Sequence, residues 1–159
     1  MRVYISGKIG GEVISDATRQ KFARAEEILK AKGYQVFNPC DERWQKILRR
    51  EYEHDNYVRS PWLTDKFPDF YAYCLLRDLM VLSTKDAILM LDDWADSPGA
   101  QSEYHFAKAT KKTIFFTKRE DAVIYLEERW KEGNKVVKTR APRYKFVDNH
   151  LHKVWLPIE

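Results

Sequence analysis

The sequence predicts an α/β protein with a doubly wound parallel sheet of four to five strands and helices on both faces. Short apolar runs of strand length alternate along the chain with longer segments in which apolar residues recur at helical spacing. Each strand-like run lies close to the helix-like segment that follows it. Parallel strands need a crossover connection, which is usually a helix, so this alternation is typical of a parallel sheet.

The expected strands are short apolar runs. In the first of them Val3 and Ile5 share one face and Tyr4 lies on the other, because side chains alternate along a strand. The third has the length and composition of a buried strand. The four runs are Arg2–Ser6, Tyr34–Phe37, Ala87–Leu91 and Thr113–Thr117.

The expected helices carry start and stop signals. Ser97 before Pro98 is typical of a helix start, and Gly33 is typical of a helix end. The five expected helices are Thr18–Lys32, Glu42–Glu53, Asp69–Leu82, one from Ser97 through Lys108, and one from about Glu120 to Glu132. The inward-facing residues are Phe22, Ala25, Ile28 and Leu29 in the first helix, and Tyr73, Leu76, Leu79 and Met80 in the third.

The chain of 159 residues suits one domain, 1–159, with a proper core. Residues 41–68 are interrupted by prolines and aromatic residues, and we interpret them either as an insertion or lid or as a plain surface connector. Residues 134–159 form a C-terminal extension in which basic and apolar residues are interleaved. A last strand or a hairpin is expected there, followed by a docking segment that contains Trp155, Leu156 and Ile158.

The composition narrows the classes of function. The net charge of +4 favours anionic ligands such as nucleotides but is too small to predict a nucleic-acid binder, and the basic stretch 134–145 is interpreted as a solvated surface. Two cysteines give neither a disulfide framework nor a zinc site, and no metal or cofactor is predicted. No apolar run is long enough to span a membrane and no signal peptide precedes the first strand, so a cytoplasmic protein is expected.

Glu103 is the centre of the functional hypothesis. It lies in the middle of the packing face of its helix, where a carboxylate is costly unless it has a partner or a role. A glutamate at the rim of that face, reaching solvent, is the plain alternative. The helix begins just after a strand, however, and ligands of open α/β sheets bind at the carboxyl ends of the strands. The free amide groups of Gly99 and Ala100 are expected to face the same crevice and to suit a phosphate.

Two carboxyl groups beside one crevice permit cleavage of a glycosidic bond. Glu103 is the candidate nucleophile, and Asp78, near the end of the preceding helix, is expected close to it. Tyr4 either hydrogen-bonds the nucleophile or is an ordinary aromatic residue of the sheet. Asp93 either caps the turn after its strand or binds a ribose hydroxyl. A loop with three glycines, at positions 6–11, follows the first strand and lets a ligand approach the backbone closely.

Three short blocks resemble the nucleoside 2-deoxyribosyltransferase superfamily. They are Tyr4–Gly11, Arg77–Leu79 followed by Lys85–Leu89, and Ser97–Glu103, and their order and spacing agree with that superfamily. The resemblance implies a flavodoxin-like sheet, a covalent glycosyl intermediate on Glu103, and roles for Asp78 and Tyr4 in orienting the sugar and the carboxylate. It also implies a homo-oligomer, since members often complete their sites with a neighbouring subunit. The candidate substrate-binding residues are Ser6, Gly7, Lys8, Ile9, Gly10, Asp93, Ser97, Gly99 and Ala100.

Ser97 bears on the substrate. The corresponding position is usually Asp in deoxynucleoside transferases and is a phosphate-contacting Ser in the 2'-deoxynucleoside 5'-phosphate N-hydrolases, so the resemblance favours a nucleotide, with Lys8 as a further phosphate contact. Trp94 and the long 41–68 segment are closer to a phage- and bacterium-associated branch of the superfamily. The expected activity is hydrolysis or base exchange at the N-glycosidic bond of a (deoxy)nucleotide or (deoxy)nucleoside. The alternatives are a nicotinamide-dinucleotide glycohydrolase and a nucleotide sensor without catalysis.

Overall fold

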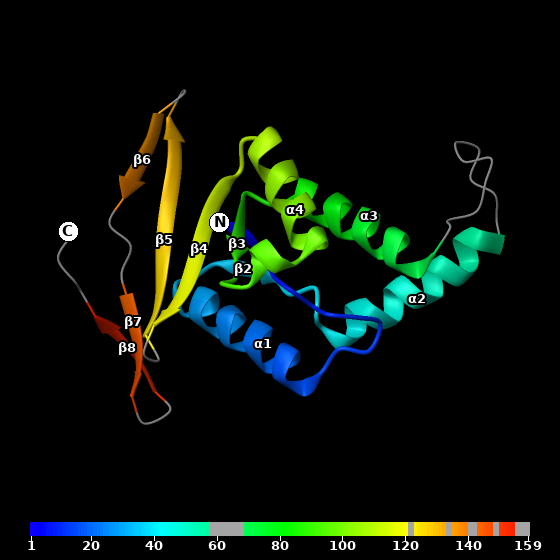
Figure 1. Ribbon diagram of the computed structural model, residues 1–159, viewed down its shortest axis with the longest axis horizontal. Helices are drawn as coiled ribbons and strands as arrows, with labels where there is room; N and C mark the ends of the chain where they lie inside the picture. Colours follow the sequence, from blue (N-terminus) through cyan, green and yellow to red (C-terminus); the bar gives the residue numbers. More distant parts are fainter. Residues whose placement is uncertain (58–68, 121–122, 133–134, 140–142, 148–149, 155–159) are drawn as a thin grey trace.

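The computed structural model describes the backbone of residues 1–57, 69–120, 123–132, 135–139, 143–147 and 150–154, and the side chains of residues 1–54 and 69–117. Within these residues, helices flank a sheet that continues into antiparallel strands toward the C-terminus (Figure 1). The N-terminal part of the sheet, with its helices, positions the candidate site.

Four parallel strands form the N-terminal part of the sheet. They are β1 (Arg2–Ser6), β2 (Gln35–Phe37), β3 (Ala87–Met90) and β4 (Thr113–Glu120). Their order is β2-β1-β3-β4, with Val3 paired to both Val36 and Ala87. This is the strand order with which a flavodoxin-like sheet begins, and the predicted α/β fold class is confirmed.

Helix α1 (Asp16–Ala31) covers one face of the parallel strands. The side chain of Ser15 caps its first turn, and Gly33, with φ of +82°, follows its end. The four residues predicted to face inward are all buried: Phe22, Ala25, Ile28 and Leu29. They pack against Val3 and Ile5 of β1 and against Leu89 and Phe115, so this face is a purely apolar core.

The other face is covered by α3 (Phe70–Ser83) and α4 (Pro98–Ala109), which pack on Tyr4, Ile88 and Met90. A short 3-10 helix, η1 (Trp94–Asp96), connects β3 to α4. The buried residues of α3 are Tyr73, Asp78 and Leu82. The prediction that Leu76 and Met80 face inward was wrong, since they are 44% and 52% exposed. Helix α3 is apolar on most sides, so hydrophobic periodicity cannot select its packing face, and the inward position is held by an aspartate.

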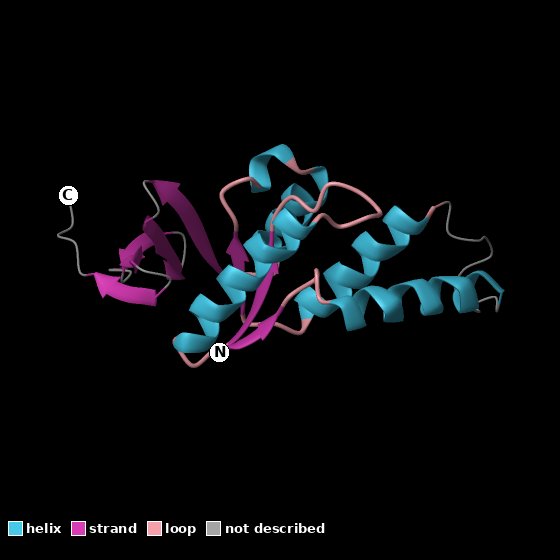
Figure 2. Ribbon diagram, turned by 90° about the horizontal axis from the view of Figure 1, so that it is seen from below, coloured by secondary structure: helices cyan, strands magenta, loops and turns pink. Residues whose placement is uncertain are grey.

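Helix α2 (Glu42–Tyr57) occupies the first part of the segment predicted as a lid or connector. It lies alongside α3 (Figure 2) and packs on the same face of the sheet through Trp44, whose ring meets Phe37 edge to face. Leu48 is completely buried. This helix is therefore part of the packed structure, while residues 58–68 lie outside the described residues.

The helix predicted over Glu120–Glu132 was wrong. The described residues of this range are Glu120, the last residue of β4, and 123–132, which form β5 (Val123–Glu132). Strand β5 pairs antiparallel with β4 over a long register that includes Thr117 opposite Leu126. The charged residues 127–132 have good helix propensity, but long-range pairing with a strand overrides so weak a local preference.

The C-terminal extension continues this antiparallel pairing. Strands β6 (Lys135–Thr139) and β7 (Arg143–Val147) both pair with β5, and β8 (His150–Val154) pairs with β7. The strand or hairpin expected there is confirmed, and the antiparallel strands extend the sheet beyond the four to five predicted. The proposed docking segment, residues 155–159, lies outside the described residues. No helix in the described part of the chain is long and apolar enough to cross a bilayer.

Candidate active site

Glu103 is buried at the interface between α4 and β1, with 7% of its surface exposed. The hydroxyl of Tyr4 donates a hydrogen bond to Oε1 of Glu103 at 2.6 Å, and the hydroxyl of Ser6 donates to Oε2. Tyr4 and Ser6 are two residues apart on one strand, so both point to the face that α4 covers. Each carboxyl oxygen of Glu103 therefore has its own hydroxyl donor from the rigid sheet.

The environment of Glu103 opposes its ionisation. Burial raises the pKa of Glu103 to about 8, because desolvation penalises the carboxylate more than the hydrogen bonds from Ser6 and Tyr4 stabilise it. Burial also raises the pKa of Tyr4 well above its usual value, and the neighbouring Glu103 adds to that effect. Tyr4 therefore stays a hydrogen-bond donor throughout the physiological pH range.

Asp78 supplies the second carboxyl group from α3 and is likewise 7% exposed. The indole nitrogen of Trp44 donates a hydrogen bond to Oδ1 of Asp78 at 2.9 Å. Burial raises the pKa of Asp78 to about 7, although the Trp44 hydrogen bond and the charge of Arg77 act in the opposite direction. Arg77 is itself held at 2.6 Å by Glu51 of α2, so α2 organises the surroundings of Asp78 in two ways.

A hollow of about 390 Å³ connects the two carboxyl groups, which both line it. That volume lies within the range of small-molecule sites. The walls come from the loop after β1, from α3 and from the start of α4, at the carboxyl ends of β1 and β3. The lining residues include seven of the nine predicted substrate-binding residues: Gly7, Lys8, Ile9, Gly10, Ser97, Gly99 and Ala100.

Asp93 holds the glycine-containing loop in place. Its carboxylate accepts a hydrogen bond from the backbone amide of Lys8 at 3.0 Å and forms an ion pair with Lys21, whose ammonium group also donates to the carbonyl oxygen of Lys8. A Cβ at Gly7 would lie 2.9 Å from the side chain of Leu91 and 3.1 Å from Oδ1 of Asp93, so any larger residue would require these side chains to shift. Asp93 makes no side-chain capping hydrogen bond in the turn after β3, and its contact with a ribose hydroxyl stays a prediction.

The start of α4 offers fewer free amide groups than the sequence predicted. The side chain of Ser97 caps the helix by accepting a hydrogen bond from the amide of Ala100 at 3.3 Å. The expectation that the Ala100 amide is free was therefore wrong, because the serine that starts the helix also satisfies that donor. Pro98 has no amide hydrogen, and the hydroxyl of Tyr71 lies beside Gly99.

The structure divides the predicted site residues into those that line the hollow and those that hold Glu103 or the loop after β1 in place. Tyr4, Ser6 and Asp93 are not among the lining residues of the hollow and instead hold Glu103 or the loop.

Trp44 was missed by sequence reasoning. Its indole reaches Asp78 across 34 positions of the chain, and no local pattern pairs two residues so far apart. The signal available was an aromatic donor in a charged helix, which by itself indicates only packing.

The arrangement suits proton transfer and nucleophilic attack. Two buried carboxyl groups line one hollow, and burial raises the pKa of Asp78 to about 7 and that of Glu103 to about 8, so each can gain or lose a proton near neutral pH. One group can then act as nucleophile while the other donates or accepts a proton. Among the described residues, no group of three or more His, Cys, Asp or Glu side chains could hold a metal ion.

Residues 1–116 match a protein family described as Domain of unknown function (DUF4406), and this range holds the parallel sheet and every residue of the candidate site. The chain belongs to this family. No curated protein matches the chain. Among solved structures, the chain is similar to a 2-deoxyribosyltransferase from Bacillus psychrosaccharolyticus, with 15% identity over 73% of this chain and 71% of that chain and a TM-score of 0.46.

Proposed function

We propose that the protein is an enzyme that cleaves the N-glycosidic bond of a nucleoside or nucleotide, with Glu103 as the nucleophile. One observation carries the proposal. A buried carboxyl group, each oxygen of which has a hydroxyl donor, lines a hollow of nucleoside size beside a second buried carboxyl group. Burying two carboxyl groups costs stability, and such pairs are a feature of sites that attack and protonate.

The reaction begins from the form in which Glu103 is ionised and Asp78 holds a proton, with attack by a Glu103 oxygen on the anomeric carbon of the sugar. The carbon–nitrogen bond breaks, and the base leaves with the bonding electrons and takes a proton from Asp78 or from water. Tyr4 and Ser6 orient the attacking carboxylate throughout. Asp78, once deprotonated, accepts a proton from water as the water attacks the glycosyl ester, which releases the sugar and restores Glu103. A second base in place of water gives base exchange.

The sequence motifs support the same assignment independently of the geometry. Glu103 ends a block similar to the nucleophile block of the nucleoside 2-deoxyribosyltransferase superfamily, and Tyr4 and Asp78 lie in the two other similar blocks. The three blocks are far apart in the chain. In the fold, Tyr4 donates a hydrogen bond to Glu103, and Glu103 and Asp78 line the same hollow, which supports this assignment.

A substrate panel tests the proposal directly. The protein is incubated with ribo- and deoxyribonucleosides, their 5'-monophosphates and a nicotinamide dinucleotide, and released bases are measured by chromatography. We expect release from at least one nucleoside or nucleotide, with a loss of at least about 10³-fold in Glu103→Gln. Glu27→Gln, an exposed change on α1, serves as the matched control and is expected to keep full activity. Full activity in Glu103→Gln, or binding without any base release, would contradict the proposal.

A further inference from the structure

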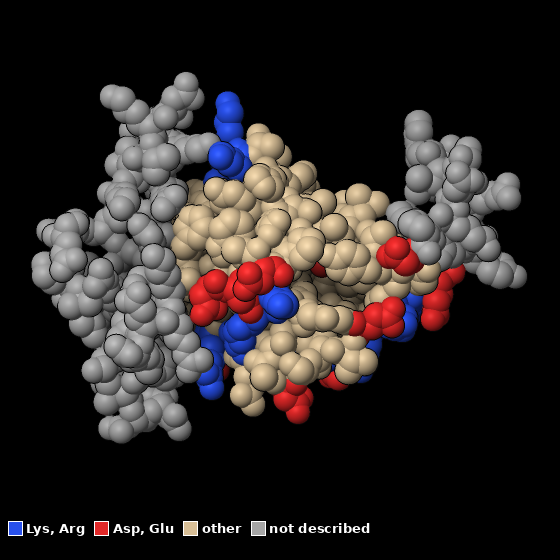
Figure 3. All heavy atoms as spheres, viewed as in Figure 1, with Lys and Arg blue, Asp and Glu red and all other residues tan. Residues whose placement is uncertain are grey.

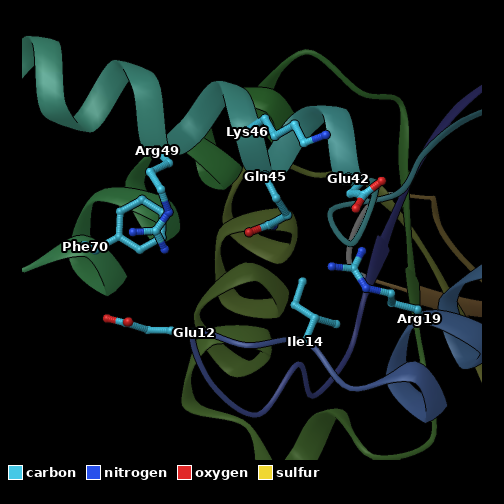
Figure 4. A pocket seen from close by; sticks show the side chains of 8 residues that line it. All are labelled: Glu12, Ile14, Arg19, Glu42, Gln45, Lys46, Arg49 and Phe70. Atoms are coloured by element: carbon cyan, nitrogen blue, oxygen red, sulfur yellow. The ribbon is translucent and has the colours of Figure 1, made fainter.

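A second, smaller hollow of about 220 Å³ adjoins the candidate active site. It lies between α1 and α2, and Figure 4 shows side chains of α2 reaching down toward it and Arg19 of α1 on the opposite side. Four residues line both hollows: Glu12, Ile14, Gln45 and Phe70. A ligand seated at Glu103 can therefore extend into this side hollow without leaving the cleft.

The two hollows differ in their balance of acidic and basic side chains. The active-site hollow is lined by four acidic side chains and by the single basic side chain of Lys8; the acids are Glu12, Asp78, Asp96 and Glu103. The side hollow is lined by three basic side chains, Arg19, Lys46 and Arg49, with Glu12 and Glu42 as its acids. On the face shown in Figure 3, charged side chains form a few clusters and most of the described surface is uncharged. An anionic group is thus favoured in the side hollow, where basic side chains outnumber acidic ones, over the active-site hollow, where Lys8 is the basic side chain.

Both arginines of the side hollow are held in place before any ligand binds. Arg19 donates one hydrogen bond to the carbonyl oxygen of Cys40 at 3.0 Å, which leaves its other N–H donors for a ligand. The guanidinium of Arg49 lies 4.5 Å from the centre of the Phe70 ring, a stacking contact that occupies the flat face and leaves the N–H edge open. A planar arginine edge matches the oxygens of a phosphate group.

The start of α4, where the sequence predicted a phosphate, competes poorly for it. The amide of Ala100 is taken by Ser97 and Pro98 has no amide hydrogen, so most of the anion-binding capacity of that helix start is lost. Asp96 lines the same part of the hollow and adds a negative charge.

We infer that the substrate is a nucleotide whose phosphate binds to Arg19 and Arg49 in the side hollow while its sugar lies at Glu103. This inference rests on the proposed function, because it assigns the position of the sugar. It makes Arg19 and Arg49 the residues that distinguish a nucleotide from the corresponding nucleoside. It also gives α2 a role in substrate selection, since Arg49, Lys46 and Gln45 all belong to it.

Binding measured by calorimetry in the Glu103→Gln background tests the inference without turnover. The probes are a panel of nucleoside 5'-monophosphates and the matched nucleosides. We expect the monophosphates to bind at least about tenfold more tightly, and Arg49→Ala and Arg19→Ala each to remove most of that preference while nucleoside affinity stays unchanged. Arg24→Ala on α1 and Arg43→Ala on α2 are matched controls that line neither hollow. Arg49 is exposed, so its variant keeps the test valid if Arg19→Ala unfolds.

Three results would overturn the inference. The first is equal affinity for nucleosides and monophosphates. The second is a preference that survives Arg49→Ala but is lost in Lys8→Ala or Ser97→Ala, which would place the phosphate at α4. The third is an equal loss for nucleosides and monophosphates in the arginine variants, which would place the base in the side hollow. Because binding alone is measured, a protein that binds monophosphates through these arginines but releases no base would contradict only the proposed function.

Discussion

The two carboxyl groups of the site are equally buried but are held in different ways. Glu103 receives two hydrogen bonds from hydroxyl groups of one strand, Tyr4 and Ser6 of β1. Asp78 receives a single one, from the indole of Trp44 on α2. Glu103 is thus fixed by the central sheet, whereas Asp78 depends on the packing of one helix against another.

The difference matches the two chemical tasks. A nucleophile must keep one orientation toward the anomeric carbon, and two donors on a rigid strand provide that. A group that moves protons has to change its charge during the reaction, and one donor leaves an oxygen of Asp78 open to the hollow. Apart from a control at Asp86, each prediction below changes one side of this comparison and leaves the other intact.

Asp78→Asn removes the proton-transferring group and leaves the hydrogen bonds to Glu103 in place. We expect kcat/KM for base release to fall by about 10²–10³-fold, because protonation of the leaving base and activation of water both lose their catalyst. The limb of the pH profile near the pKa of Asp78, at about 7, should disappear with it. If Asp78→Asn keeps the wild-type rate and pH profile, a group other than Asp78 transfers the proton.

Glu103→Gln is expected to stabilise the folded protein at alkaline pH. The pKa of Glu103 is about 8 in the fold against 4.5 normally, so the folded state holds a proton that the unfolded state releases between these values. Stability therefore falls as pH rises through that window, and glutamine removes a penalty on the order of 4 kcal/mol at pH 8 and little of it at pH 5. Thermal unfolding at both pH values measures the gain.

Asp86→Asn is the control for the measurement of thermal unfolding, because the pKa of Asp86 is lowered in the fold whereas that of Glu103 is raised. The guanidinium of Arg2 lowers the pKa of Asp86 to about 2, so its ionised form favours folding above the normal pKa and that contribution is lost in acid. The variant should lower the melting temperature at neutral pH. If Glu103→Gln loses stability at pH 8, the hydrogen bonds that Glu103 accepts from Tyr4 and Ser6 outweigh the cost of burying its carboxylate.

Tyr4→Phe removes one of the two donors to Glu103 with little change of shape. The hydrogen bond favours the carboxylate, so its loss raises the pKa of Glu103 further and shifts the acidic limb of the activity profile to higher pH. We expect a shift of about one pH unit and a loss of about tenfold below pH 7. Ser6→Ala should shift the limb in the same direction. If the pH profile moves in neither variant, the hydroxyl groups of Tyr4 and Ser6 do not influence the pKa of the nucleophile.

The sequence predicted the Glu103 side of the site well and the Asp78 side poorly. Strand alternation places Tyr4 on the correct face, and the helical period places Glu103 inward, so two local patterns meet at one point. Asp78 was expected nearby, but its partner Trp44 lies in a segment whose packing no local signal reveals. The apolar surface of α3 also drew the prediction to Leu76 and Met80, which are exposed.

The contrast between features set by local sequence patterns and features set by distant contacts also holds for the fold of the whole described chain. Strands and helices within residues 1–116 follow from apolar periodicity, caps and glycine stops, because each is stabilised largely by what its own pattern buries. The helix predicted over Glu120–Glu132 failed because β5 is defined by its partners β4, β6 and β7. Pairing between distant strands leaves only a weak trace in a single segment.

Trp44→Phe is the smallest change expected to affect catalysis, and it tests whether α2 only packs or also positions Asp78. Phenylalanine keeps the ring contact with Phe37 but lacks the indole donor, so the pKa of Asp78 rises above about 7 and the carboxyl group gains freedom to rotate. We expect a loss of about threefold to tenfold in kcat, a shift of the Asp78 limb to higher pH and little change in KM. Trp94→Phe, at a tryptophan that contacts Tyr104 and Phe116, is the matched control. If both variants lower activity without moving the pH profile, Trp44 acts through packing alone, and Asp78 takes its orientation from α3.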